Sequence, residues 1–534
     1  MNKAFNIHRA IFAILLLASG RPAIAETDVP HPTYTWSLTP TTGDWDTPAN
    51  WDPEGVPDAY NEQAVFGASS VTNITSSTFK ILRSVQFEAG AGQYIINASA
   101  SIDLDDEGVF NDSGITQIFN GTTFSFGAGA TAGDLVTYNA TSVSFGNGGD
   151  PATATFYLTG GAFFSGGPSA ITTAGNATFY NSGGIGFFKL TDAGEATFIN
   201  YGGDSFGAAG AQVYFHRKSN AASSTIILYG ASVSGAYGAN LTFYKSNAGS
   251  ATLIAYGGTG DPGSGGNILF LTESGGGLAR VEVFGNGSID FSRPGVANNT
   301  IGSLEGDGIV YLGDGTLTIG YNNLSTTFGG TFTEEGGFHE GGPGSISKTG
   351  SGTLTLTGAN DYTAGTTVES GLLFVNNTSG SATGSGPVSV AGGGLAGDGI
   401  ITGPLTVGTG SSSGAALAPG VSSSTTGTLT VQNALSLLAD ATYEAQLNST
   451  TLLADDVTAA GVIINGAKIR VGDLGATALA SGTSFTLINN TSFTPISGTF
   501  SNLPDGGTLT IGNNTFQANY EGGDGNDLTL TVVP

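Results

Sequence analysis

The sequence predicts an all-β protein, an elongated parallel β-helix or β-solenoid closed by capping regions at its N- and C-terminal ends. Three observations predict this fold. Glycine supplies 88 residues, about 16% of the chain against a usual 7%. Short alternating stretches such as 353–357 (TLTLT) have the period of a β-strand. Landmark residues also recur every 28 residues or so, and strands this short bury their apolar face only when copies are stacked above and below.

Composition excludes several classes of function. With 14 basic and 41 acidic residues the net charge is −27, which argues against nucleic acid and against an anionic membrane surface as partners. The absence of cysteine excludes disulfides, thiolate metal sites and a thiol nucleophile. Since 10% of residues are charged, we expect a surface of Ser, Thr, Asn and Gly, as in a secreted, soluble stack.

Residues 1–25 have the pattern of a secretory signal peptide. Lys3 and Arg9 give a positive start, an apolar run covers 10–18, and 23–25 form an A-x-A cleavage site. The apolar run is too short for a membrane anchor, which needs about 18 residues, and we expect no transmembrane helix later in the chain. The expected location is secreted, extracellular or at the cell surface, with the periplasm as the alternative.

Residues 26–90 contain all three tryptophans, Trp36, Trp45 and Trp51. Exposed tryptophans could stack on sugar rings. The interpretation that we favour is an N-terminal cap whose aromatic side chains cover the open end of the solenoid, because an uncapped end exposes strand edges that can pair.

Residues 91–344 carry an internal repeat of roughly 28 residues. An Ala-Thr-Phe/Leu landmark with glycine six positions after the alanine starts at Ala154, Ala177, Ala196 and Ala251, with looser copies at Ser224 and Ala279. An apolar-x-Phe landmark starts at Ile185, Val213, Leu241 and Ile268, with gaps of 28, 28 and 27 residues. A third strand per coil is suggested at 205–206, at Val233 and at 289–291. Stacking of the coils predicts an internal ladder, about 4.8 Å per step, of Phe187, Phe215, Phe243 and Phe270.

Residues 345–431 begin with the string SISKTGSGTLTLTGANDYTAGTTVESGLLFVNN, from 345 to 377. This string resembles the autotransporter-associated β-strand repeat of large secreted bacterial proteins, although Asp361, Ala364 and Leu372 depart from the usual residues. The tryptophan spacing resembles a motif that often opens proteins with these repeats. The resemblance implies a secreted bacterial β-solenoid.

Residues 432–534 resemble the C-terminal module of the same family, and we expect them to form closing β-strands. They are too few for the usual autotransporter barrel. We therefore expect this chain to lack a self-transport domain.

Candidate catalytic and metal sites are absent from the pattern. No histidine pair has metal or triad spacing, and no G-x-S-x-G elbow occurs. The acidic neighbours 105–106, 334–335 and 455–456 point to opposite faces of a strand, so we interpret them as solvated corners. The glycine- and aspartate-rich segment 522–527 occurs once, and we expect a turn rather than a calcium site there. We predict no cofactor.

One basic constellation stands out from the acidic background. Lys189, Arg217 and Lys245 each follow the second landmark by four positions, in three consecutive copies. Stacked coils place them in a column of like charge, which is unfavourable unless it is solvated or holds an anion. One interpretation is a row of fully solvated corner residues. The other is a basic stripe that binds an acidic glycan, to which His216 and Lys218 also contribute.

The leading functional hypothesis is a non-enzymatic, secreted or cell-surface rod, adhesin-like or structural in a matrix. Extracellular polysaccharide and other surface proteins are the expected partners. The alternative is a polysaccharide-binding or polysaccharide-degrading parallel β-helix, such as a lyase or hydrolase. An external face that gathers two carboxylates with an Arg or Lys would favour this alternative.

Overall fold

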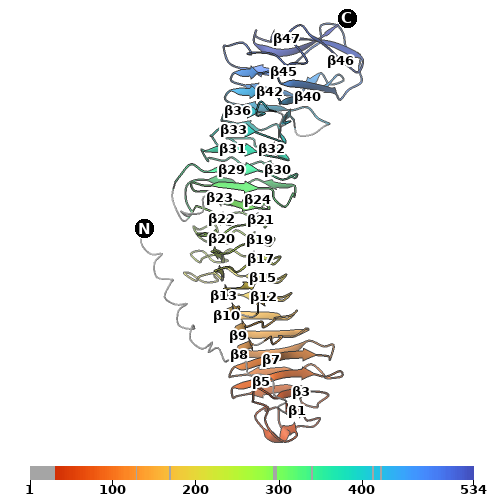
Figure 1. Ribbon diagram of the computed structural model, residues 1–534. Coiled ribbons are helices and arrows are strands. Elements are labelled where there is room, and N and C mark those ends of the chain that lie inside the picture. The colour runs from red at the N-terminus through yellow and green to blue at the C-terminus, as the bar shows by residue number, and fades with distance from the viewer. Residues whose placement is uncertain are drawn as a thin grey trace.

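The computed structural model describes residues 31–127, 129–167, 170–292, 298–337, 341–411, 414–420 and 424–534. It confirms an all-β, elongated stack of strands that runs from β1 at one end to β47 at the other (Figure 1). The predicted signal peptide lies outside the described residues. One 3-10 turn, Pro48–Asn50, is the helical element of these ranges, and no helix there is long and apolar enough to cross a membrane.

Each coil has three sides, which the chain visits in the order A, B, C. Side A consists of β4 (Asn73–Ser76), β6 (Ile95–Ala98), the first halves of β8 (Gln117–Gly127), β9 (Val136–Gly146) and β10 (Thr155–Ser165), then β12 (Thr178–Asn181), β15 (Thr197–Asn200), β17 (Thr225–Leu228), β19 (Thr252–Ala255), β21 (Arg280–Val283), β24 (Ser303–Gly306), β27 (Thr326–Phe328), β30 (Thr353–Leu356), β32 (Leu372–Val375), β34 (Gly394–Gly397), β37 (Ala416–Pro419), β40 (Thr442–Asn448) and β44 (Lys468–Asp473).

Side B follows after a short corner. It consists of the first halves of β5 (Lys80–Phe87) and β7 (Ile102–Asn111), the second halves of β8, β9 and β10, then β13 (Gly184–Phe188), β16 (Gln212–His216), β18 (Asn240–Tyr244), β20 (Asn267–Phe270), β22 (Ser288–Asp290), β25 (Ile309–Tyr311) and β28 (Thr331–Thr333). In the later coils this position is taken by β35 (Ile400–Ile401), β38 (Thr428–Val431), β42 (Asp456–Ala459) and β45 (Ser484–Asn490).

Side C completes the coil. It consists of β1 (Thr33–Trp36), β3 (Gln63–Phe66), the second halves of β5 and β7, β11 (Thr172–Thr173), β14 (Thr191–Asp192), β23 (Asn298–Ile301), β26 (Thr316–Ile319), β29 (Ser345–Lys348), β31 (Gly365–Val368), β33 (Val388–Val390), β36 (Leu405–Val407), β39 (Leu435–Leu437) and β43 (Val462–Ile464).

Parallel pairing in register explains the repeat of landmarks. Ile185 pairs with Val213, which pairs with Leu241 and then Ile268, as the second landmark predicts. Because strands alternate their side chains between two faces, every second residue lies inside the coil and is buried. Identical side chains one coil apart therefore stack along the axis.

The predicted phenylalanine ladder is confirmed and is longer than the sequence indicated. Ring centroids of Phe187, Phe215, Phe243 and Phe270 are separated by 4.5, 5.0 and 4.8 Å in consecutive steps. The complete ladder on side B runs through Phe126, Phe145, Phe164, Phe187, Phe215, Phe243, Phe270 and Phe291. A second inner ladder, on side A, stacks Phe119, Tyr138, Phe156, Phe179 and Phe198. The two ladders meet edge to face, and this double column forms the core.

The predicted third strand was placed wrongly. Residues 205–206 and Val233 lie in turns between sides A and B, and Phe206 is 86% exposed. Residues 289–290 belong to β22 on side B, where Ile289 pairs with Ile268. The third side follows side B and is marked there by bridges such as Asn220 with Asn247. Because each of these coils has only a single bridge on side C, the sequence there has no alternating apolar pattern that would predict a strand.

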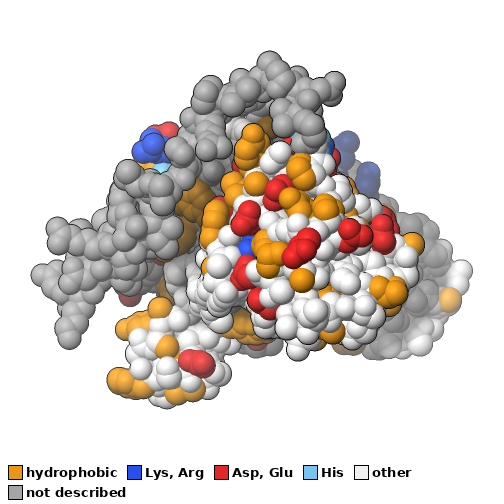
Figure 2. Space-filling model, turned by 90° about the horizontal axis from the view of Figure 1, so that it is seen from below, with side chains coloured by type: hydrophobic (Ala, Val, Ile, Leu, Met, Phe, Trp, Pro, Cys, Tyr) orange, Lys and Arg blue, Asp and Glu red, His pale blue; other side chains and the backbone are white. Residues whose placement is uncertain are grey.

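The exterior carries few charged side chains, as the composition predicts. Figure 2, which looks onto the N-terminal end of the stack, shows acidic side chains scattered over a surface made mostly of uncharged groups. The molecule is therefore an acidic column with a mostly uncharged surface and a buried apolar core.

The three tryptophans are buried at the N-terminal end. Trp36, Trp45 and Trp51 are 1%, 0% and 3% exposed, and their indole N–H groups donate to backbone carbonyls. The exposed sugar-stacking surface considered from the sequence is thus ruled out for these side chains. Their rings pack against one another and against Phe66, the first large side chain of the inner core, which is the packing expected of a cap.

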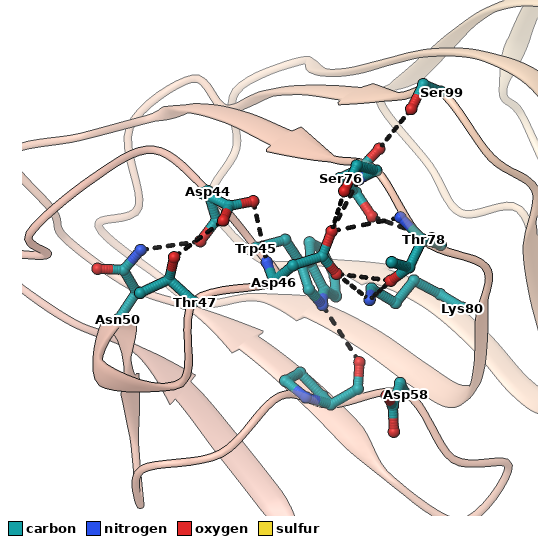
Figure 3. Close-up of polar contacts among 12 residues, drawn as sticks. Asp44, Trp45, Asp46, Thr47, Asn50, Asp58, Ser76, Thr78, Lys80 and Ser99 are labelled. Carbon is teal, nitrogen blue, oxygen red and sulfur yellow. Dashed lines mark hydrogen bonds and ion pairs between the residues drawn. The ribbon is translucent and has the colours of Figure 1, made fainter.

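A polar network joins the tryptophan-bearing loop to the next coil (Figure 3). The Asp46 carboxylate accepts hydrogen bonds from the Ser77 and Thr78 backbone and hydroxyl groups and forms an ion pair with Lys80. The Lys80 side chain is fully buried. Burial alone would raise the pKa of Asp46, but the hydrogen bonds from Lys80, Thr78 and Ser77 outweigh it and hold that pKa far below its usual value.

The C-terminal end changes from parallel to antiparallel pairing. β45 pairs with β48 (Asp527–Val533), which pairs with β47 (Asn514–Gly522), and β47 pairs with β46 (Thr508–Ile511). Short antiparallel partners also occur at β2 (Trp51–Asp52) and β41 (Leu453–Ala454). Residues 523–526 form the turn between β47 and β48, as predicted, and Asp527 accepts a hydrogen bond from the Asn490 backbone at 2.9 Å.

Candidate functional site

The three predicted basic residues lie at one corner of successive coils. Lys189, Arg217 and Lys245 each follow the last residue of a side-B strand, and those strands pair in register. All three have positive φ, at 64°, 51° and 51°, which marks the same tight corner in each coil. The structure therefore brings them together as a column, which we call the basic corner.

An external aromatic row runs beside the basic corner. Phe163, Phe188, His216 and Tyr244 stack with centroid separations of 5.0, 5.8 and 4.9 Å. Partial burial and the neighbouring Arg217 lower the pKa of His216, so this ring is neutral near pH 7. The basic corner ends at Glu273, whose carboxylate lies 2.8 Å from the Lys245 ammonium and raises the pKa of that lysine.

A second cluster, absent from the sequence predictions, lies on the exterior of side A. Glu282 and Glu305 are paired residues of β21 and β24, so their side chains leave the same face one coil apart. The Arg280 guanidinium lies 3.1 Å from Glu282 and donates from Nε to Glu305 at 2.5 Å. Burial raises the pKa of Glu282, Arg280 opposes that rise, and Glu305 adds to it. We call these three residues the side-A charge cluster.

The two carboxylates of the side-A charge cluster, Glu282 and Glu305, line one wall of a groove of about 380 Å³. The other residues that line the groove are Phe284, Gly306, Ser325, Thr326, Thr327, Thr353 and Thr355. Two carboxylates with an arginine on an external face is the grouping that the sequence analysis named as favouring the polysaccharide alternative. Sequence reasoning missed it because Glu305 is 23 residues from Glu282 and looks like an ordinary surface acid.

The acidic neighbours behave differently from the prediction at one place. Asp105 and Asp106 are exposed, as expected of corners, whereas Asp455 is 2% exposed. Burial raises the pKa of Asp455 to about 6, although backbone N–H groups of Gly427 and Gln446 donate to its carboxylate. The solvated-corner interpretation is therefore wrong for Asp455, because its carboxylate is buried against the Gly427 and Gln446 backbone. Within the described ranges no group of three or more His, Asp or Glu side chains is arranged to hold a metal ion.

Lys348, in the repeat at 345–377, is a buried lysine with a structural role. Its side chain is 2% exposed, and its ammonium donates to the carbonyl oxygens of Thr349, Gly350 and Ser370 at 2.6, 3.2 and 3.2 Å. Burial lowers the pKa of Lys348 to about 8. The lysine thus joins two successive coils at a corner, where the Gly350 carbonyl also accepts from the Ser370 hydroxyl at 3.4 Å.

Replacing Lys348 with methionine should weaken this corner. The Thr349 and Ser370 carbonyls lose the Lys348 donor and Gly350 keeps only the Ser370 hydroxyl, so we expect the opening free energy of the coils at 345–375 to fall by about 1–3 kcal/mol. Hydrogen exchange of their amides measures this. The matched control is Lys468→Met, at an exposed lysine of β44, which should leave exchange within about 0.5 kcal/mol of the parent. Equal exchange in both variants would contradict the structural role.

Comparisons with known proteins support the resemblance to the autotransporter-associated repeat over part of the chain. A family model described as the passenger-associated-transport-repeat matches residues 346–373. The adhesin BmaC autotransporter of Brucella suis biovar 1 (strain 1330) is 35% identical over 109 residues, which are 20% of this chain and 3% of that protein. The chain therefore spans a small part of that relative's length, and it carries an autotransporter-associated passenger repeat built into a β-solenoid.

Proposed function

We propose that the chain is a non-enzymatic, adhesin-like or structural rod that is secreted or displayed at the cell surface. The observation that carries the proposal is the uninterrupted parallel pairing on side A, which includes the recognised repeat at β30 and β32. A stack of this kind supplies length and lateral surface instead of an enclosed site. The partial similarity to an adhesin supports the same class.

The basic corner is the proposed contact for an acidic glycan. Lys189, Arg217 and Lys245 lie along one edge of a molecule with a net charge of −27. Lys245 is paired with Glu273, so the attraction for anions rests mainly on Lys189 and Arg217. Extracellular polysaccharide and surface proteins with acidic chains are the proposed partners.

Retention on polygalacturonate and alginate beads tests this contact. The mature chain, residues 26–534, should be retained at low salt, and Lys189→Ser/Arg217→Ser/Lys245→Ser should elute at clearly lower salt, because exposed charge pairing is screened by ions. The matched control removes two exposed basic residues elsewhere, Lys468→Ser/Arg470→Ser. Unchanged retention of the triple variant would remove the acidic-glycan contact from the proposal.

Location is tested by fractionating the native cells with an antibody against the mature chain. Protein in the surface-bound or released fraction is expected if the rod works outside the outer membrane. Protein confined to the periplasm would contradict the adhesin-like role.

The polysaccharide-degrading alternative has a specific observation in its favour, the side-A charge cluster. Both carboxylates are bound to Arg280, however, and an ion-paired carboxylate is a poor general base. Release of reducing ends or unsaturated products from a polysaccharide panel would establish the enzymatic function, and the Glu305→Gln variant would then have to abolish it.

A further inference from the structure

A column of aromatic side chains leads along the exterior of side A to the groove. Tyr201, Tyr229, Tyr256 and Phe284 each follow the last residue of a side-A strand, and their centroid separations are 5.9, 5.3 and 5.4 Å. Neighbouring planes differ by 12–17°, so the rings lie face to face along the axis. The inner rings of this column therefore present only their edges and hydroxyls to solvent.

The column ends at Phe284, and its last ring face borders the groove. In the next coil Gly306 pairs with Val283, and the position that would continue the column is held by Asp307, whose carboxylate accepts a hydrogen bond from the Gly285 backbone at 2.8 Å. Both Asp307 and Gly308 donate to the Val283 carbonyl, so the backbone turns there. A Cβ on Gly306 would lie 3.2 Å from the Phe284 ring and closer still to the Val283 carbonyl oxygen. Phe284 thus has Tyr256 on one face and the groove on the other.

The walls of the groove combine three kinds of group. Phe284 supplies an apolar face, and β27 and β30 supply threonine hydroxyls. The Glu282 and Glu305 side chains line the groove and are 14% and 25% exposed, and Arg280 forms ion pairs with both from outside the lining. Hydroxyls both donate and accept, and carboxylates accept. This mixture complements a ligand that has one apolar ring face and a rim of hydroxyl groups.

We propose that this groove is a subsite for one pyranose ring of a neutral polysaccharide, with the ring stacked on Phe284 and its hydroxyls bound by Glu282, Glu305 and the threonine hydroxyls of β27 and β30. The charge balance selects the ligand. Two carboxylates against one guanidinium, on an acidic molecule, disfavour an acidic sugar. Arg280 offsets part of their charge, which weakens the attraction for a basic peptide, but it contacts only Oε1 of each carboxylate, so Oε2 can accept from sugar hydroxyls. The volume of about 380 Å³ lies within the range of small-ligand sites. The subsite is independent of the basic corner and of the acidic-glycan contact proposed above.

Titration calorimetry of the mature chain with four neutral hexasaccharides tests the subsite. The probes are the β-1,4-glucose, β-1,3-glucose, β-1,4-mannose and β-1,4-N-acetylglucosamine hexamers. We expect at least one to bind with a millimolar or lower Kd, and we expect Phe284→Leu and Glu305→Gln each to weaken that binding about tenfold. Leucine keeps the apolar contact of Phe284 with Tyr256 but removes the flat ring face.

Tyr229→Leu is the matched control, because Tyr229 lies inside the same column with Tyr201 and Tyr256 on its two faces. It should bind the hexamer as the parent does, and circular dichroism should show all variants folded. The proposal is overturned if none of the four hexamers binds, or if binding survives both Phe284→Leu and Glu305→Gln. Binding of an oligolysine peptide that depends on Glu305 and not on Phe284 would also overturn it. Retention on acidic glycans tests the proposed role of the basic corner separately.

Discussion

Replacing Phe215 with alanine should destabilise the middle of the rod by about 3–5 kcal/mol, the usual cost of removing a buried phenylalanine. Phe215 is fully buried and stacks on Phe187 and Phe243 at 4.5 and 5.0 Å. Its removal leaves a cavity between two rings that backbone pairing holds in place. The neighbouring coils are therefore unable to close the gap by moving together.

The loss should be local because each coil contacts only its neighbours. Hydrogen exchange should show faster opening of β13, β16 and β18, with β31 and β33 unchanged. Phe206→Ala is the matched control, since Phe206 lies in the same coil but is 86% exposed. Uniform destabilisation along the whole chain, or an equal effect of both variants, would contradict a nearest-neighbour ladder.

The sequence predicted the coil and its inner ladder because both depend on repetition. The inner ladder recurs at nearly constant spacing, at Phe187, Phe215, Phe243 and Phe270. In a fold of stacked coils, residues at a constant spacing lie one above another. The ladder continues to Phe145 and Phe164, where the spacing shortens to 19 residues, because the loops between sides shorten while the strands stay in register. Period-based reasoning loses the ladder at that point although the packing does not change.

The groove was not predictable by the same reasoning. It forms where repetition fails, at the step from Phe284 to Asp307, and its carboxylates come from two coils whose register is set by backbone pairing. The basic corner, in contrast, repeats every 28 residues and was found at once. Nor did the sequence indicate that Asp455 is buried, because it belongs to an Asp-Asp pair like that of the exposed Asp105.

Replacing Asp46 with alanine should cost the N-terminal coils about 3–5 kcal/mol, because it leaves the fully buried Lys80 ammonium without its counter-charge. The Thr78 hydroxyl at 2.7 Å would be its remaining polar partner among those of Figure 3. Hydrogen exchange of β3, β4 and β5 measures the loss. The matched control is Asp52→Ala, at an exposed aspartate of the same loop, which should have little effect.

The double variant Asp46→Leu/Lys80→Met separates the charge from the packing. Replacing both partners of a buried ion pair by apolar residues is often neutral, so most of the single-variant loss should be recovered.

The pH dependence of stability tests the same ion pair. The folded pKa of Asp46 is lowered, so the stability it contributes is present above its unfolded pKa of about 4 and is lost as the pH falls toward the folded value. The parent chain should therefore lose protection in β3–β5 below about pH 4 more steeply than the double variant does. A double variant as unstable as Asp46→Ala, with the same acid response as the parent, would show that the coils are held by packing that leucine and methionine disturb and not by this ion pair.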